Sequence, residues 1–138
     1  MIHPALRVYG WTVDFLFAVK QNDEEGVLGC LYDYGATKRV IEDVLDIMDP
    51  ALVDCGFTFS NSDRRVCLSW IGPQSAGAQY INTTVHEIVH VAMAVAREAG
   101  INPLSETFAY LVGDITQEVS DILCELGCDH CREGGLRD

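Results

Sequence analysis

The apolar residues in the first half of the chain largely alternate with polar ones, as they do in β-strands. Residues 7–19 follow this pattern and predict one strand, and residues 27–34 predict a second strand that pairs with it as a hairpin. A further hairpin is expected from residues 56–60 and 65–71, which flank a short polar turn. The first half therefore predicts a small antiparallel sheet.

Apolar residues spaced three and four apart predict the helices. Residues 38–48 carry one such stripe, with Thr37 as the expected N-cap. The region from about residue 81 to 99 predicts a long helix that ends at Gly100. Ser105 is the expected N-cap of another long helix, which runs to about residue 126. Because a short turn joins these last two helices, they should pack antiparallel.

Together these elements predict a single α+β domain over residues 1–138, a length that is sufficient to bury an ordinary core. Its sheet-rich half, residues 1–79, contains the small antiparallel sheet and one helix. This half is expected to pack against the two long C-terminal antiparallel helices, residues 80–126. A cysteine-containing tail follows at residues 127–138.

The charge and the apolar content exclude some classes of partner. A net charge of −12 argues against nucleic-acid binding, because the phosphates would be repelled. No apolar run of about 18 residues predicts a membrane span, and the N-terminus lacks the pattern of a secretory signal. We therefore expect no membrane partner and a cytoplasmic location. In that compartment the six cysteines are expected to be thiols or metal ligands rather than disulfides.

The pentapeptide His86-Glu87-Ile88-Val89-His90 carries the most specific chemical pattern in the chain. Two histidines four apart on a helix share one face and can hold one Zn²⁺, and the adjacent glutamate can accept a proton from water on that metal. The same pattern also suits half-buried histidines beside a glutamate that pairs with a neighbouring charge. The apolar residues on both sides favour a metal site, because they would keep the ligands dry and oriented.

A third protein ligand is expected, because catalytic zinc usually has three and leaves one position for water. Glu106 is the leading candidate, since it lies in the first turn of the helix that follows the short turn. An antiparallel helix pair would bring that turn back toward the end of the histidine helix. Whether it reaches the level of His86 and His90 depends on where the loop breaks, which the sequence leaves open.

The chain also resembles a known group of proteins over residues 80–114, about a quarter of its length. Residues 84–92 (TVHEIVHVA), 100–101 (GI) and 106–111 (ETFAYL) are similar to the small zincin-like proteins of phage and prophage genomes. These belong with the gluzincins, zinc peptidases that use a glutamate on a second helix as third ligand. The resemblance implies a minimal metallopeptidase with His86, His90 and Glu106 as ligands and Glu87 as the base. It also implies the host cytoplasm as the location, if a phage encodes the chain.

The sequence departs from the gluzincin pattern after the candidate ligand glutamate. Many gluzincins, thermolysin among them, have an aspartate four residues later that orients the first histidine. Tyr110 stands at that position here, and Asp114 lies one further turn along the same helix face. Tyr110 is a candidate hydroxyl donor to the metal site or to an oxyanion, and Asp114 a candidate partner of a metal ligand. A packed Tyr110 and a solvated Asp114 are the structural alternatives.

The cysteines near the C-terminus form a second cluster. A second metal site is one interpretation of Cys124, Cys128, His130 and Cys131, because thiolates and imidazoles are good zinc ligands. Their spacing differs from that of a zinc ribbon, and the three cysteines also fall on one helix face, where they could be buried thiols. The other three cysteines are expected in strands, as core thiols: Cys30, Cys55 and Cys67.

These observations support three hypotheses of different classes. The first is a zinc-dependent hydrolase of the peptidase type, acting on a peptide or protein substrate with Glu87 as general base. The second is a non-catalytic, phage-associated assembly or host-interaction protein that keeps a structural or vestigial metal site. The third is a protein with the zincin shape and no metal.

Overall fold

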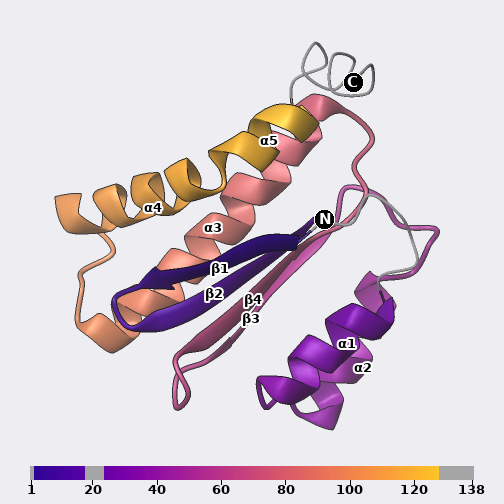
Figure 1. The fold of residues 1–138 in the computed structure, drawn as a ribbon, viewed down its shortest axis with the longest axis horizontal. Coiled ribbons are helices and arrows are strands. Elements are labelled where there is room, and N and C mark those ends of the chain that lie inside the picture. The colour runs from indigo at the N-terminus through magenta and orange to yellow at the C-terminus, as the bar shows by residue number, and fades with distance from the viewer. Residues whose placement is uncertain (1, 18–23, 128–138) are drawn as a thin grey trace.

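A mixed four-stranded sheet separates two groups of helices (Figure 1). The computed structural model describes residues 2–17 and 24–127. Within them the strands are β1 (Ile2–Val8), β2 (Trp11–Phe17), β3 (Gly56–Asn61) and β4 (Val66–Ile71). The helices are α1 (Glu24–Asp33), α2 (Lys38–Ile47), α3 (Gly77–Ala99), α4 (Glu106–Glu118) and α5 (Ser120–Gly127). The α+β class is therefore confirmed.

The sheet has the strand order β1-β2-β4-β3, so that β1 and β3 are its edges. The β1/β2 and β3/β4 pairs are antiparallel, but β2 and β4 run parallel. The prediction of an antiparallel sheet is thus wrong for the central pair of strands, β2 and β4. Parallel neighbours need a crossover connection, and the chain between β2 and β4 supplies one that contains α1, α2 and β3.

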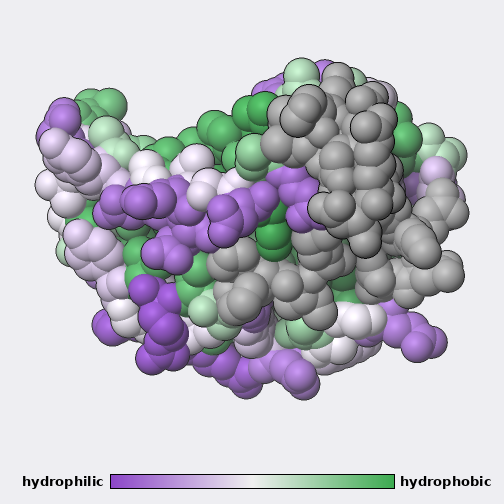
Figure 2. Space-filling view, turned by 45° about the horizontal axis from the view of Figure 1, so that its top comes forward, coloured by the Kyte–Doolittle hydropathy of each residue, from purple (hydrophilic) through white to green (hydrophobic). Residues whose placement is uncertain are grey.

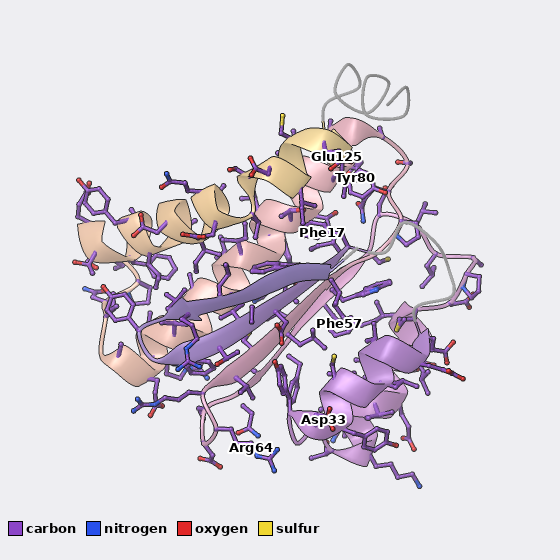
Figure 3. All side chains as sticks on the ribbon, in the orientation of Figure 1. Phe17, Asp33, Phe57, Arg64, Tyr80 and Glu125 are labelled. Carbon is purple, nitrogen blue, oxygen red and sulfur yellow. The ribbon has the colours of Figure 1, made fainter. Side chains whose placement is uncertain are left out.

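Both faces of the sheet are covered by helices, and each face has its own hydrophobic core. Phe17 and Tyr80 lie in the core beneath α3, α4 and α5, whereas Phe57 lies in the core that α1 and α2 cover (Figure 3). Every second residue of β2 is buried, and these residues belong to the first core. Strand β4 supplies Cys67 and Ile71 to the first core and Leu68 and Trp70 to the second.

The N-terminal third differs most from the sequence-based prediction. The single strand expected at residues 7–19 is a hairpin of two strands, because Tyr9 and Gly10 form a tight turn with φ values of 49° and 79°. The strand expected at residues 27–34 is wrong, since this stretch lies in helix α1. Its two buried residues, Val27 and Leu31, are four apart and pack on the sheet from one helix face.

The local signals at helix ends and in the second hairpin are confirmed. Thr37 caps α2 by accepting a hydrogen bond from the Val40 amide, at 3.3 Å, and the β3/β4 hairpin forms as expected. Helix α3 begins at Gly77, four residues earlier than predicted, and Gly100 ends it in the left-handed conformation, with φ of 71°. Ser105 caps α4 by accepting from the Phe108 amide, also at 3.3 Å.

The last predicted helix is divided in two. Helix α4 ends at Glu118, and α5 begins at Ser120, whose hydroxyl donates a 2.7 Å hydrogen bond to the Gln117 carbonyl. The two pieces run back along α3, and a Cβ on Gly127 of α5 would lie within 2.7 Å of Ile81. The last two predicted helices therefore run antiparallel as expected, but the second of them is broken into α4 and α5.

Hydrophilic side chains form a band across the face shown in Figure 2, with hydrophobic ones beside it. None of the helices in the described residues combines the length and the apolar content that crossing a bilayer requires.

Candidate metal centre

Helix α3 presents three different faces, and these determine where its chemical groups lie. Ile88, Val91 and Val95 are fully buried against the sheet. Glu87, next to this apolar face, is also buried, with only 4% of its surface exposed. The side chain of His86 is 65% exposed, and His90 is exposed as well. The helix therefore directs the histidines to solvent and the glutamate toward the sheet.

The two histidines lie close enough to share one ion. Their Nε2 atoms are 3.2 Å apart, and the ring centroids are separated by 4.9 Å. Two imidazoles on a tetrahedral zinc, each about 2.05 Å from the metal, would place their nitrogens about 3.3 Å apart. The observed distance also fits a hydrogen bond between two neutral rings in complementary tautomers. The separation of the two nitrogens is thus the one that a shared Zn²⁺ would require.

The Glu87 carboxylate has one oxygen toward the histidines and the other toward the sheet. Its Oε1 atom lies 3.8 Å from His86 Nε2, while Oε2 accepts a 2.8 Å hydrogen bond from Thr58 Oγ1 on strand β3. The ligand atoms of His86, Glu87 and His90 lie within 4.8 Å of one another. This arrangement leaves Oε1 as the oxygen that can meet a water or a metal beside the imidazoles.

A second hydroxyl continues the hydrogen-bond chain beneath Glu87. Ser69 Oγ on β4 lies 2.8 Å from Thr58 Oγ1, and Ser69 is fully buried. A hydroxyl has one proton, so when Thr58 donates to the carboxylate, Ser69 must donate to Thr58. The pairing follows from the strand register, which sets Thr58 directly opposite Ser69. The sheet thereby fixes the orientation of the carboxylate on the helix.

Gly56 allows the close approach of α3 to the sheet at this point. A Cβ on Gly56 would lie 2.9 Å from the Trp70 carbonyl oxygen, 3.0 Å from Thr83 Cγ2 and 3.2 Å from Glu87 Cγ. These distances are shorter than ordinary van der Waals contacts. The absence of a side chain at Gly56 is therefore required for the observed position of Glu87.

Cys67, on the neighbouring strand β4, is a buried thiol rather than a candidate ligand. Burial raises its pKa to about 12, and the charges of Asp14 and Glu87 act in the same direction. A thiol with so high a pKa stays protonated near neutral pH, whereas a metal ligand must be a thiolate. The prediction that Cys67 is a core thiol in a strand is confirmed.

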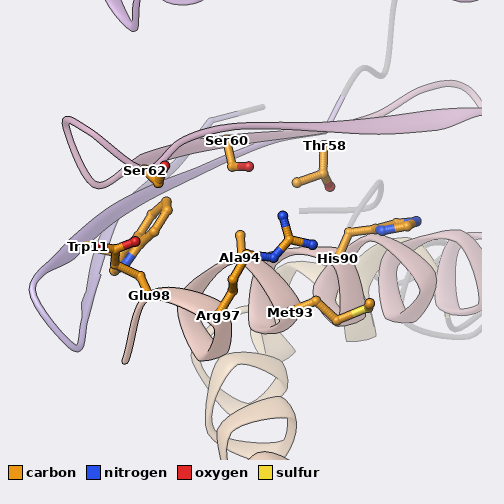
Figure 4. A pocket seen from close by; sticks show the side chains of 9 residues that line it. All are labelled: Trp11, Thr58, Ser60, Ser62, His90, Met93, Ala94, Arg97 and Glu98. Carbon is orange, nitrogen blue, oxygen red and sulfur yellow. The ribbon is translucent and has the colours of Figure 1, made fainter. Parts of the chain in front are cut away.

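A cavity of about 330 Å³ opens beside the histidines, between α3 and the edge strand β3 (Figure 4). Its lining comes from the β1–β2 hairpin, the β3 region and α3, and comprises Trp11, Thr58, Ser60, Ser62, His90, Met93, Ala94, Arg97 and Glu98. The cavity is therefore lined both by His90, a candidate metal ligand, and by Thr58 of edge strand β3, which binds Glu87.

The structure does not bring the other predicted site residues to this group. Glu106 is exposed in the first turn of α4 and is not part of the group formed by the histidines and Glu87. The C-terminal end of α3 lies about 14 Å beyond His90 along the helix axis, and α4 starts only after a further loop. Tyr110 is 66% exposed, which excludes the packed alternative for its side chain.

Asp114 lies at the opposite edge of the sheet from the histidines. It lines a separate shallow pocket together with Leu6, Arg7 and Val8 of β1, whereas the histidines lie near β3. Its side chain is exposed, as the solvated alternative expects. This position offers no contact with the candidate metal ligands.

Cys124 is exposed on α5, and Cys128, His130 and Cys131 lie outside the described residues. Of the remaining cysteines, Cys30 lies on helix α1 rather than in a strand, because the predicted strand is a helix there. Cys55 directly precedes β3 and is partly buried.

Sequence reasoning missed the residues that hold Glu87, namely Thr58, Ser69 and Gly56. One signal was present: Ser69 interrupts an otherwise apolar strand, and a buried polar side chain needs a partner. The partner itself depends on the register of β3 with β4 and on the docking of α3, which no local pattern encodes.

Comparison of the chain with protein families, with curated proteins and with solved structures found no match. The resemblance to phage zincin-like proteins therefore remains a prediction that rests on the motif residues.

Proposed function

We propose that the protein is a metal-dependent hydrolase of the peptidase type, in which His86 and His90 hold one ion and Glu87 is the general base. The observation that supports this most directly is the 3.2 Å separation of the two Nε2 atoms, which suits a shared tetrahedral ion. Zinc is the expected metal, because two neutral imidazoles with water suit it well.

Bound zinc would supply Lewis acidity that lowers the pKa of water toward neutrality. The residues of the chain would do the rest. Glu87 would accept the proton from that water through Oε1, while the Thr58 hydroxyl keeps Oε2 in place and so fixes the direction of proton transfer. Glu87 could then pass the proton to the leaving amine, as expected of a general base in peptide hydrolysis.

A peptide is the proposed substrate class because of the strand beside the site. Strand β3 pairs only with β4 within the described sheet, so its other edge has no strand partner there, and its residues Thr58 and Ser60 line the cavity. An extended peptide can add to such an edge through main-chain hydrogen bonds. This would bring successive peptide carbonyls past His90.

One observation favours the non-catalytic alternative, a phage-associated assembly or host-interaction protein with a structural or vestigial metal site. In the described part of the chain, His86, Glu87 and His90 form the only metal-capable group, so a third ligand besides Glu87 is absent there. If Glu87 itself completes the ligand set, the site would lack a base and would bind metal without hydrolysis.

Elemental analysis and a Glu87→Gln variant distinguish the two functions. The protein purified without added metal is expected to contain close to one zinc per chain, and His90→Ala should lose most of it. Glu87→Gln should keep the zinc yet cleave a mixed peptide library at least about a hundredfold more slowly, since a positioned base contributes about 10²–10⁴-fold. Loss of zinc in Glu87→Gln would instead assign Glu87 as a ligand and overturn the base assignment.

A further inference from the structure

The cavity beside His90 contains one cation that has no partner among the described residues. Arg97, on α3, makes no ion pair or hydrogen bond with them, although the chain has 21 acidic residues and only nine basic ones. Its guanidinium points into the space between α3 and strand β3 (Figure 4). Arg97 is exposed, so its guanidinium is open to a ligand that enters the cavity from solvent, and its fixed fork of donors matches a carboxylate.

The position of Arg97 relative to the histidines is set by the helix. His90 and Arg97 are seven residues apart, which is two turns of α3, and both line the same cavity. The axial rise between them is about 10 Å. An extended peptide advances about 3.3 Å per residue, so about three residues would span this rise.

The other lining groups suit a peptide carrying one negative charge. Ser60 and Ser62 contribute hydroxyls from the side of β3, and a hydroxyl can donate to a carboxylate oxygen. Glu98 lies near Trp11 at the end of the cavity away from His90 (Figure 4). Its negative charge would disfavour a second anion at that end of the cavity.

We propose that Arg97 makes the cavity selective for peptides with a carboxylate within about three residues of the cleaved bond. The inference rests on the proposed function and names the substrate class of that site. An acidic side chain and the free C-terminus of a peptide carry the same group, and both satisfy the geometry.

The test compares matched peptides on the zinc-loaded protein. Each pair differs by Glu or Gln at one position, and a second set has the C-terminus free or amidated. Charge-assisted hydrogen bonds contribute about 1.5–3 kcal/mol, so kcat/KM should favour the carboxylate about 10- to 150-fold at one position. The set in which the preference occurs identifies the source, whether a side chain or a C-terminus.

Two variants separate recognition by Arg97 from a general charge effect. In Arg97→Gln the ratio of kcat/KM between the Glu and Gln peptides should fall to near one. In Arg97→Glu the Glu peptide should become the poorer of the two, and a peptide with Lys at the same position should be preferred. Arg39→Gln is the matched control, because it removes the same charge from an exposed position on α2, across the sheet. An unchanged preference in Arg97→Gln, or an equal loss in Arg39→Gln, would overturn the inference.

Equilibrium binding keeps this test independent of catalysis. Fluorescence anisotropy of the same labelled peptides is measured on Glu87→Gln and on the double variant Glu87→Gln/Arg97→Gln. A carboxylate preference in binding that depends on Arg97 supports the inference, even if the wild type cleaves no peptide. The lack of cleavage would then overturn only the proposed hydrolysis. Binding that ignores the carboxylate would overturn the inference even in an active enzyme.

Discussion

Thr58 on edge strand β3 donates a 2.8 Å hydrogen bond to the buried carboxylate of Glu87 on α3. This one contact joins the sheet to the histidine helix at the point where the proposed chemistry occurs. It also satisfies an acidic group that is almost entirely removed from water, which would otherwise be strongly unfavourable.

Thr58→Val should therefore destabilise the protein, because the isosteric side chain removes the donor and leaves the carboxylate oxygen unpaired. The free energy of unfolding, measured with urea, is expected to fall by about 1.5–3 kcal/mol. Thr58→Ser is the matched control, since it keeps the hydroxyl. Equal losses in both variants would show that the threonine methyl group, and not the hydrogen bond, is responsible.

Gly56→Ala should also be destabilising, by about 1–3 kcal/mol, because the new Cβ would meet the Trp70 carbonyl at 2.9 Å and Glu87 at 3.2 Å. The same substitution at Gly113, in the exposed part of α4, has open space around it. Gly113→Ala should be neutral or stabilising by up to about 1 kcal/mol. Thermal or urea unfolding of the two variants gives the comparison, and similar values for both would argue against a close contact at Gly56.

Zinc should stabilise the folded chain, since an ion that binds only the native state raises the free energy of unfolding. At a free zinc concentration of 100 times Kd the gain is about 2.7 kcal/mol, and EDTA should reverse it. His86→Ala and His90→Ala should abolish the effect. Val85→Ala, at a neighbouring exposed position without a metal-binding atom, should retain it. A zinc effect that persists in both histidine variants would place the ion elsewhere.

Glu106→Ala should leave zinc affinity unchanged, because Glu106 is not part of the group formed by His86, Glu87 and His90. Isothermal titration with zinc is the measurement. A tenfold or greater loss of affinity would restore Glu106 as the third ligand and would require α4 to move toward the histidines when metal binds.

Stability should decrease at alkaline pH because of Cys67. Burial raises the pKa of this thiol from its ordinary value of 9.0 to about 12 in the fold, so the unfolded chain, in which the thiol is exposed to water, loses its proton first. The contribution is complete below pH 9 and is lost between pH 9 and about 12, with a slope of up to about 1.4 kcal/mol per pH unit. Urea unfolding of wild type and Cys67→Ala across this range should show a shallower slope in the variant.

Local chemistry explains which parts of the fold the sequence predicts. Thr37, Gly100 and Ser105 mark helix ends through capping groups or backbone conformation, and these act within a few residues. The stretch that forms α1 is short, and its apolar residues fit a strand as well as a helix, so periodicity alone does not distinguish them. Its contact with the sheet decides in favour of the helix.

Part of the candidate site can likewise be predicted from the sequence, and part cannot. The positions of His86, Glu87 and His90 on one helix follow from their spacing, and helical geometry brings the two imidazoles together. The support of Glu87 by Thr58 and the distance of Glu106 from the group depend on how separate elements dock. Such contacts join residues far apart in the chain, and a single sequence carries no direct signal of them.

Strand β3 has little freedom to slip against β4. Its side chains alternate, so that Phe57 and Phe59 pack beneath α1 and α2 while Thr58 and Ser60 face α3 and the cavity. Displacement by a single residue would exchange the two sets, placing aromatic rings in the groove and hydroxyls in the apolar core. The same shift would remove the partner of Glu87, so incorrect pairing would be penalised on both faces of the sheet at once.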